Sequence, residues 1–568
     1  MKMLKGRNMI IAVLIFSIAS LIIQSAQIFS NGYILGVDSI FHMNRIYETM
    51  MQIRTGQFSY FISLFSYEQS GRIVNALYGP GMAYLLGSIL LYCKSWIHFQ
   101  LITSFLINVI GAYGVYKISK KMASSNLFAI LVGIIYMSTY FVSSWNVAGS
   151  FTGVGNMLIP YVIYYGIEMV TNEHFNFSIV GLGLSMGILL QTHIFSSLLS
   201  TLVLAPFIIY ALIMTEKKWS FIKNICLSVL IAVFLSLNVW IGMYQVFSEN
   251  YLLQTVPLDL LQNSVYFSPQ AGTSQANIGL FLTVLLFLPL VQTMMNWRNQ
   301  DNKIRLLVCT GGFFLVLSSR FFPWEFFSRY FPVLESVLQF PSRFIIVPTV
   351  LFLSSLHVTV RSLKKKNLLV IVIIGMIFSV SNAQNRILDR MGEWRSENVL
   401  ASPNRKPESI SSTELRNSLR NDDLGEIFKI VQKGTSDYLP LKESITNQEF
   451  ETFDPYSKYW EYVIRPNNQF DKTVEDGQLV ISWESDTESD IGIPVFKYHQ
   501  TVVKDGDTGK EVSYTLSDIG TIIVHSNIGL NKIIVSYPTS SIIMMSIVLA
   551  LMTLFVCLGS MIFMKLQR

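Results

Sequence analysis

The chain has 568 residues, of which 51% are hydrophobic and only 14% are charged. Soluble globular domains average roughly a quarter charged residues, so this composition excludes an ordinary soluble enzyme. The net charge is +6, and 25 of the 36 acidic residues lie between Asp389 and Asp518. Because most basic residues elsewhere sit in short clusters between apolar runs, the charge pattern indicates membrane topology and excludes a nucleic-acid-binding surface.

The first apolar run, Met9 to Phe29, follows Lys2, Lys5 and Arg7. It is longer than the core of a signal peptide, so we expect a retained first helix. Eleven further runs are long enough to cross ~30 Å of hydrocarbon as helices. They begin near Phe99, Leu127, Val154, Phe177, Ile194, Phe221, Ile278, Arg305, Phe344, Leu368 and Ile542.

If these twelve spans alternate in direction, every basic cluster falls on one side, which the positive-inside rule assigns to the cytoplasm. Both termini are therefore expected to be cytoplasmic, and spans five and six must be joined by a tight outer turn at Gln191–His193. The clusters are Lys2, Lys5 and Arg7; Lys117, Lys120 and Lys121; Lys217 and Lys218; Arg298 and Lys303; Arg361, Lys364, Lys365 and Lys366; and Lys565 and Arg568.

Four segments then face outward: 30–97, 247–276, 320–342 and 385–539. The last shows alternating runs such as Gln478–Trp483 and Thr521–His525, with turn signals between them, and predicts a β-rich domain. The expected fold class is an all-α polytopic membrane protein with an extracytoplasmic β-rich domain. Its divisions are a transmembrane core at 1–384, the outer domain at 385–539, and a last helix with a short cytoplasmic tail at 540–568.

The first outer segment carries Asp38, His42 and Arg45 at helical spacing, so that they share one face of a helix. Apolar residues on the other face predict a helix at the membrane surface with its polar side toward a cleft. One interpretation is an ordinary solvated face. The other is a catalytic carboxylate, with Asp38 taking a proton from a hydroxyl, His42 orienting it or binding metal, and Arg45 holding a phosphate.

Aromatic and basic residues are mixed at 320–343, where Arg320, Glu325, Arg329 and Arg343 occur. This pattern is typical of an aromatic belt at the membrane interface, and equally of a site for a lipid phosphate, with Arg343 as the first candidate. His193, at the predicted outer turn, is a secondary candidate on the same side of the membrane. For a lone histidine, a structural role is the alternative.

Motifs of soluble enzymes are missing from the sequence. It has no Walker A loop, no G-x-G-x-x-G entering a helix and no H-E-x-x-H. No predicted inner loop is long enough for a nucleotide-sugar-binding fold. If the chain is a transferase, its donor is carried by a lipid and used on the outer face.

The layout of one helix, a long outer loop opening with Gly36-Val-Asp-Ser-Ile-Phe-His-Met-Asn-Arg45, and a many-helix body resembles the GT-C superfamily of membrane glycosyltransferases. Those enzymes use polyprenyl-phosphate sugars and carry a functionally important acid in the first outer loop. Short motifs are similar to the bacterial YfhO-like membrane protein group: Gly56-Gln-Phe58, Tyr78-Gly-Pro-Gly81, Leu338-Gln-Phe-Pro-Ser-Arg343-Phe and Asp437-Tyr-Leu-Pro440.

The resemblance implies that Asp38 is the catalytic base or an acceptor-positioning acid, and that Arg343 contacts the donor phosphate. Many GT-C enzymes carry paired acids in this loop, whereas here Ser39 follows Asp38. A second acid would then be Glu325 or Glu48, and a divalent metal ion is left open as a cofactor.

The leading hypothesis is an inverting glycosyltransferase of the bacterial cell membrane. It would move a sugar from polyprenyl phosphate, expected to be undecaprenyl phosphate, to a cell-envelope glycan, teichoic acid or glycolipid. Its expected partners are this donor, the acceptor and membrane lipids, with no nucleic acid. Two alternatives stay open: a transporter or flippase for a lipid-linked saccharide, and a non-catalytic scaffold for envelope assembly.

Overall fold

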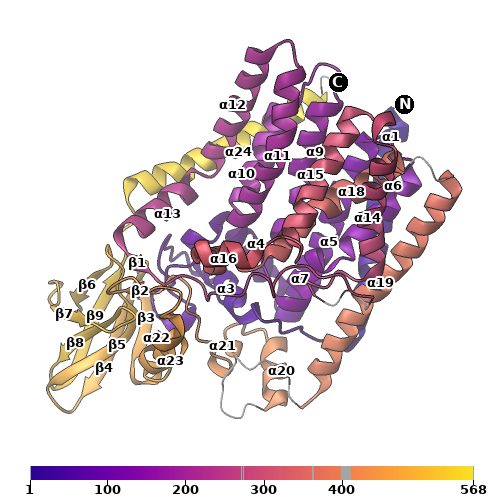
Figure 1. Cartoon of the computed structure of the whole chain (residues 1–568). Coiled ribbons are helices and arrows are strands. Elements are labelled where there is room, and N and C mark those ends of the chain that lie inside the picture. Colours follow the sequence, from indigo (N-terminus) through magenta and orange to yellow (C-terminus); the bar gives the residue numbers. More distant parts are fainter. Residues whose placement is uncertain are drawn as a thin grey trace.

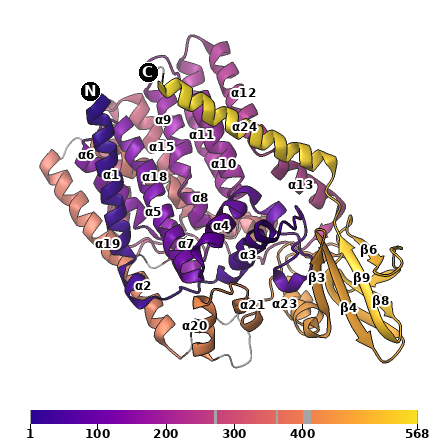
Figure 2. The same cartoon turned by 180° about the vertical axis from the view of Figure 1, so that it is seen from behind.

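The computed structural model describes residues 2–269, 272, 274–360, 364–397, 399 and 411–566, with 2–5 and 565–566 as backbone only. Arg361, used in the topology prediction, and residues 567 and 568 of the predicted tail lie outside the described residues. Figures 1 and 2 show a tall body of helices with a smaller domain of strands attached at one end.

The helical body is built from most of the chain before residue 396 and from the last helix. In chain order its helices are α1 Lys2–Ile23, α2 Ser25–Ser30, α3 Ser39–Thr55, α4 Pro80–Cys93, α5 Trp96–Lys121, α6 Asn126–Met137, α7 Tyr140–Ala148, α8 Thr152–Asn156, α9 Ile159–Thr171, α10 Ile179–Leu190, α11 Ile194–Met214, α12 Lys218–Leu235, α13 Leu237–Glu249, α14 Leu280–Met295, α15 Asn302–Ser318, α16 Trp324–Tyr330, α17 Val333–Val337, α18 Ile346–Thr359, α19 Lys365–Arg395 and α24 Ser541–Leu566.

Within the described residues, eight segments are long and apolar enough to cross a membrane: Gly6–Ile23, Trp96–Lys121, Asn126–Ala148, Ile194–Met214, Lys218–Leu235, Pro341–Thr359, Lys365–Arg395 and Ser541–Met564. The other four predicted spans correspond to shorter helices: α9, α10, α14 and α15. The fold class of a polytopic helical membrane protein with a β-rich domain is confirmed, and the count of twelve spans stays a prediction.

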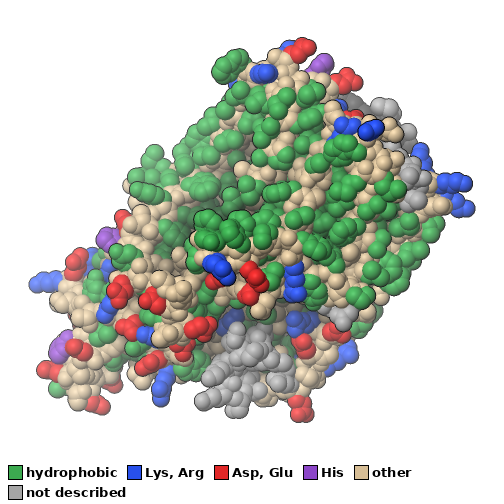
Figure 3. All heavy atoms as spheres, in the orientation of Figure 1, with side chains coloured by type: hydrophobic (Ala, Val, Ile, Leu, Met, Phe, Trp, Pro, Cys, Tyr) green, Lys and Arg blue, Asp and Glu red, His purple; other side chains and the backbone are tan. Residues whose placement is uncertain are grey.

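Both chain termini lie at the end of the body opposite the strands (Figures 1 and 2). Two contacts join the C-terminal ends of helices. One links α5 to α9, and the other links the turn after α5 to α18. Lys121 pairs with Glu168 at 3.1 Å, and Ser124 lies 2.8 Å from Nδ1 of His357. In Figure 3 hydrophobic side chains cover much of the visible face of the body, while charged side chains gather at its two ends. This is the surface expected of helices that lie in lipid.

The outer domain contains two antiparallel sheets. Its strands are β3 Asp471–Glu475, β4 Gln478–Ser485, β5 Ser489–Phe496, β6 Val502–Asp505, β7 Tyr514–Leu516, β8 Thr521–Ser526 and β9 Gly529–Ser536. The order is β3-β4-β9-β6 in one sheet and β5-β8-β7 in the other. The β3–β4 hairpin turns at Asp476 and Gly477, whose φ angles of 48° and 73° match the turn that Asp-Gly favours.

A helical layer connects the sheets to the body. It comprises α20 Ser412–Arg420, α21 Glu426–Ile430, α22 Phe450–Phe453 and α23 Pro455–Tyr459. In addition, β1 Tyr251–Leu252 pairs with β2 Pro440–Leu441. The hydrophobic core of the outer domain also contains Phe61, Ile73 and Val246 from the body, so the two parts share one buried interface. The structure continues α19 to Arg395, past residue 385, where we placed the start of the outer domain.

Candidate functional site

Asp38 lies directly before α3, at a point where the chain passes very close to the end of α7. The Asp38 amide donates to the carbonyl of Ala148 at 3.0 Å. A Cβ on Gly36 would lie only 1.9 Å from the Ala148 carbonyl carbon, so this close approach requires glycine. The Asp38 side chain is partly buried. The sequence around it therefore holds the carboxylate at a defined place against the helical body.

The expectation that α3 is an interfacial helix with an open polar face is wrong. His42 and Arg45 are 3% and 0% exposed, because the following loop and Phe151 of the helical body cover the face that we assigned to a cleft. Arg45 donates to the carbonyl of Tyr78 at 2.7 Å and to Oδ1 of Asn75 at 3.0 Å. It thereby joins α3 to the residues before α4.

His42 acts as a neutral partner of Arg45. Its Nδ1 lies 3.1 Å from the Arg45 guanidinium, and its ring stacks on Phe151 with centroids 5.0 Å apart. Burial, followed by the positive charge of Arg45, lowers the pKa of His42 well below its usual value. A neutral imidazole can accept the hydrogen bond from Arg45, so His42 orients the arginine.

The Tyr78-Gly-Pro-Gly81 turn packs against the tight turn that joins α10 to α11. Gly79 has φ +82°, and a Cβ there would lie 2.4 Å from the Thr192 carbonyl oxygen. The Met82 amide donates to the carbonyl of Gln191 at 3.0 Å. Because the two turns meet in this way, the ring of Tyr78 lies 6.1 Å from the ring of His193.

His193 caps the N-terminus of α11, where its side chain accepts a hydrogen bond from the Ser196 amide. Burial, followed by the charges of Arg343 and Arg45, lowers the pKa of His193 to about 3. The ring is therefore neutral at pH 7. Its capping bond supports the structural interpretation, and its position also places it beside Tyr78 and within the field of Arg343.

Arg343 lies in a short helical turn at Pro341–Ile345, just before α18. Its guanidinium stacks on Phe195 and Phe340, at 5.1 and 4.9 Å from the ring centroids. In the described part of the chain its hydrogen bonding consists of one bond, to the Leu338 carbonyl at 3.2 Å. An arginine has five N–H donors, so most of this partly buried fork is available to a ligand.

The phenol of Tyr78 lies among four charged side chains. Burial raises its pKa, the cations Arg45 and Arg343 act in the opposite direction, and the carboxylates Asp38 and Asp437 add to the rise. Asp38 and Arg343, two predicted residues, thus both lie within electrostatic range of this phenol, and Asp38 also acts on Arg343.

Two of these groups, Tyr78 and Asp437, were not assigned a role from the sequence. Both lie in the short motifs that carry the resemblance, and those motifs were the available signal. Lys433, near Asp437 on the outer domain, reaches back to donate to the Val37 carbonyl at 2.7 Å.

Three predicted residues lie on the exposed surface around α16. Glu325 and Arg329 are exposed within this helix. Arg320 is exposed just before it and stacks on the ring of Tyr266 at 4.7 Å. The aromatic residues beside them, such as Phe321 at 72% exposure, fit the aromatic-belt interpretation.

Glu48, which we considered as a second acid, is buried and fully engaged. It accepts hydrogen bonds from the amides of Leu64, Phe65 and Ser66, and from the side chains of Ser66 and Gln52. Burial raises the pKa of Glu48 despite these donors. Because both oxygens of this carboxylate accept hydrogen bonds from neighbouring residues, Glu48 holds its loop in place and has little remaining acceptor capacity for a substrate.

The donor set around Asp38 does not fit a metal ion. Among the described residues there is no group of three or more His, Cys, Asp and Glu side chains placed to bind one. His42, the residue we considered as a ligand, faces the Arg45 cation through Nδ1.

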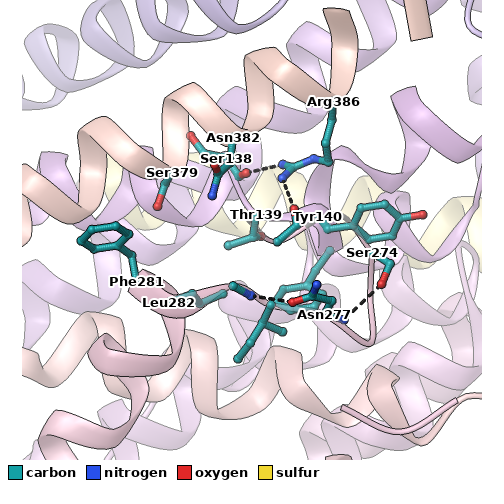
Figure 4. A pocket seen from close by; sticks show the side chains of 14 residues that line it. Ser138, Thr139, Tyr140, Ser274, Asn277, Phe281, Leu282, Ser379, Asn382 and Arg386 are labelled. Carbon is teal, nitrogen blue, oxygen red and sulfur yellow. Dashed lines mark hydrogen bonds between the residues drawn. The ribbon is translucent and has the colours of Figure 1, made fainter. Parts of the chain in front are cut away.

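A second polar centre surrounds Arg386 on α19. Figure 4 shows this side chain directed toward Ser138, with Ser274 and Asn277 across the cavity. Arg386 donates to the carbonyls of Gly272 at 2.8 Å and Ser138 at 2.6 Å. The cavity holds about 30 Å³, enough for about two water molecules and too small for a sugar or a lipid phosphate. We interpret Arg386 as a structural link between α19 and the α6–α7 turn.

No family model matches the chain, and no curated protein is similar to it. Among solved structures it is similar to ArnT from Cupriavidus metallidurans. The apo form has 11% identity and a TM-score of 0.43, over 90% of this chain and 97% of that one. The form bound to undecaprenyl phosphate has 9% identity and a TM-score of 0.40, over 92% and 97%.

The chain is also similar to the oligosaccharyltransferase of Archaeoglobus fulgidus tethered with an acceptor peptide. The identity is 11% and the TM-score 0.36, over 77% of this chain. The chain spans 61% of the length of that enzyme. The YfhO-like resemblance stays an expectation.

Proposed function

We propose that the protein is an inverting glycosyltransferase that takes a sugar from a polyprenyl phosphate and transfers it to a hydroxyl of a cell-envelope glycan, teichoic acid or glycolipid. The observation that carries this proposal is that the Asp38 carboxylate and the Arg343 guanidinium lie within electrostatic range of each other and of the Tyr78 phenol. The carboxylate can act as a general base, and the guanidinium can bind a phosphate. Arg343 also lies at the start of an apolar segment, Pro341–Thr359, that is long enough to cross a membrane.

The reaction follows from these two groups. The Asp38 carboxylate accepts the proton of the acceptor hydroxyl as its oxygen attacks the anomeric carbon. The bond from that carbon to the phosphate oxygen breaks, and polyprenyl phosphate leaves with the electron pair. Arg343 stabilises the negative charge that develops on the phosphate. Arg45 is fully buried and bound by neutral acceptors, so it positions the Tyr78 turn and leaves the phosphate to Arg343.

The test uses a strain that lacks the gene, complemented from an inducible plasmid at matched membrane levels. The sugar attached to the cell envelope is measured over time after induction, for wild type and for Asp38→Asn. Asparagine keeps the shape of the side chain but cannot take the proton. We expect the rate of sugar attachment to fall by about 100-fold or more, which is typical for loss of a general base.

The control is Glu443→Gln, an exposed acid of the outer domain, which we expect to restore attachment fully. If Asp38→Asn restores the sugar at the wild-type rate, the proposed mechanism is wrong. Transport of a lipid-linked saccharide, or scaffolding of envelope assembly, then explains the deletion phenotype better.

A further inference from the structure

We propose that Asp437 of the outer domain is the second carboxylate of the site, and that it binds the acceptor by accepting hydrogen bonds from hydroxyls next to the one that reacts at Asp38. This inference rests on the proposed function and specifies its acceptor. The portion of the acceptor at the site would be an uncharged, polyhydroxylated group such as a sugar or polyol.

The chain segment 433–438, which carries Asp437, is bound at both ends to the first outer loop. At one end Lys433 donates to the carbonyl of Val37, the residue before Asp38. At the other, the fully buried Arg72 donates to the Thr435 hydroxyl and to the carbonyl of Asp437 itself. These contacts fix the backbone of Asp437 against the loop that carries the proposed base.

Arg72 is itself held firmly in place. Its guanidinium lies over the rings of Tyr67 and Tyr459, at 5.0 and 5.4 Å from their centroids. One ring comes from the first outer loop and the other from the outer domain. The arginine therefore binds Asp437 and Tyr459 of the outer domain to the first outer loop.

The side chain of Asp437 is not used by this anchoring. The contacts described above involve only its carbonyl, and in the described part of the chain its carboxylate accepts no hydrogen bond. Burial raises the pKa of Asp437, the cations Arg72 and Lys433 lower it, and the negative charge of Asp38 adds to the rise. A partly buried carboxylate in the field of a second carboxylate is stabilised by hydrogen-bond donors, and the hydroxyls of an acceptor are suitable donors.

The backbone next to Asp437 is strained, which is common at functional sites. Tyr438 has φ +63°, a left-handed conformation that is unfavourable for a residue with a Cβ. Its amide and carbonyl are both engaged, with the Leu253 carbonyl at 3.1 Å and the Tyr498 hydroxyl at 3.1 Å. These bonds maintain the backbone turn that follows Asp437.

Two neighbouring carboxylates repel an anionic group and attract hydroxyl donors. The charges therefore direct the two substrates to different parts of the site. Arg343 binds the donor phosphate, and Asp38 and Asp437 bind the acceptor hydroxyls. The second acid that the resemblance called for would thus come from the outer domain. The two acids considered from the sequence do not take this role. Glu48 accepts hydrogen bonds from the first outer loop, and Glu325 is exposed on α16.

The test compares Asp437→Asn and Asp437→Glu with Asp38→Asn and Glu443→Gln in the same induction experiment. Asparagine keeps the backbone carbonyl that Arg72 binds. We expect Asp437→Asn to lower the rate of sugar attachment by about 10–100-fold, since two hydrogen bonds to a charged group are weakened. Asp437→Glu retains the charge and should recover part of the rate.

A second measurement separates acceptor binding from a merely structural role. Undecaprenyl phosphate is added to the purified proteins in detergent, and the shift in melting temperature is recorded. We expect Asp437→Asn to keep the wild-type shift, because the phosphate site at Arg343 is intact. Arg343→Ala should lose the shift.

The outcomes distinguish this inference from the proposed function. If Asp38→Asn is inactive and Asp437→Asn transfers sugar at the wild-type rate, the inference is wrong and the proposed function stands. If Asp437→Asn loses both the transfer and the undecaprenyl phosphate shift, Asp437 is structural and the inference is again wrong. If Asp38→Asn is fully active, the proposed function is wrong, and the inference that rests on it is wrong as well.

Discussion

Five hydrogen bonds converge on the carboxylate of Glu48, and three of them come from consecutive backbone amides of the first outer loop. Replacing Glu48 with alanine would leave these buried amides without an acceptor, at a cost of about 3–5 kcal/mol. We expect Glu48→Ala to lower the melting temperature of the purified protein sharply and to reduce its level in the membrane.

Asp38→Asn provides the comparison for this prediction. It changes an acid that begins the same helix, α3, and we expect it to melt within a few degrees of wild type while losing activity. If Glu48→Ala melted like wild type and lost only activity, Glu48 would be part of the chemistry, and its assignment to structure would be wrong.

The sequence predicted several residues of the proposed site and missed others for a physical reason. Asp38 and Arg343 were identified because an acid and an arginine beside apolar spans suggest a base and a phosphate ligand. Asp437 lies about 400 residues from Asp38 in the chain. Their proximity arises from Arg72 and Lys433, whose long side chains join distant segments, and no local pattern reports such contacts.

At the scale of elements, the order of the helices and the β-rich domain followed directly from the apolar runs and from the alternation in the outer domain. The character of α3 did not. Its periodicity indicated a helix with one solvated face, but the residues of that face bind the 64–78 loop and pack against Phe151 of the helical body. Amphipathic spacing identifies a polar face and does not reveal whether water or protein contacts it.

The contact between the Tyr78 turn and the α10–α11 turn gives a prediction at this scale. Gly79→Ala adds a Cβ at φ +82°, 2.4 Å from a backbone oxygen of Thr192. We expect it to destabilise the protein by more than the roughly 1–2 kcal/mol of left-handed strain alone, and to separate Tyr78 from His193. The measurement is the melting temperature together with the rate of sugar attachment.

Gly56→Ala is a matched control for this change. Gly56 also has a left-handed backbone, φ +73°, but a Cβ there meets nothing within 4 Å. It therefore shows the cost of backbone strain without a clash. Equal melting temperatures for the two variants would mean that the turns do not pack as closely as described.

At the scale of the whole molecule, the outer domain is joined to the body through a partly buried charged group, Glu68. This residue lies in a turn where three consecutive residues, Tyr67 to Gln69, have φ angles of 52°, 57° and 49°. Glu68 accepts a hydrogen bond from Tyr459 of the outer domain at 3.1 Å. Lys472, on β3, donates to the Glu68 carbonyl at 2.8 Å.

Burial raises the pKa of Glu68 to about 7, although Tyr459, Lys472 and Arg72 act in the opposite direction. A carboxyl whose pKa is raised in the folded state favours folding while it is protonated. Its contribution is fully present below the ordinary value of about 4.5 and is lost as the pH rises through about 7. Docking of the outer domain should therefore weaken across this interval.

Glu68→Gln tests this pH dependence. Glutamine still accepts the Tyr459 hydrogen bond but does not titrate, so the variant should gain stability relative to wild type as the pH rises from 5 to 7. Part of Glu68 is exposed to solvent, so we expect the gain to be roughly 1–2 kcal/mol. It is measured by thermal unfolding of the two purified proteins at a series of pH values.

Two features make this prediction specific to Glu68. Lys472, the facing cation, has a pKa lowered by burial to about 7, so its own contribution changes above pH 7 and leaves the interval from 5 to 7 to the carboxyl. Glu484→Gln, an exposed acid on β4, should show a difference from wild type that is constant with pH. A constant difference for Glu68→Gln as well would mean that Glu68 stays ionised, with its charge compensated by Lys472 and Arg72, and that the domain docks equally well at pH 5 and pH 7.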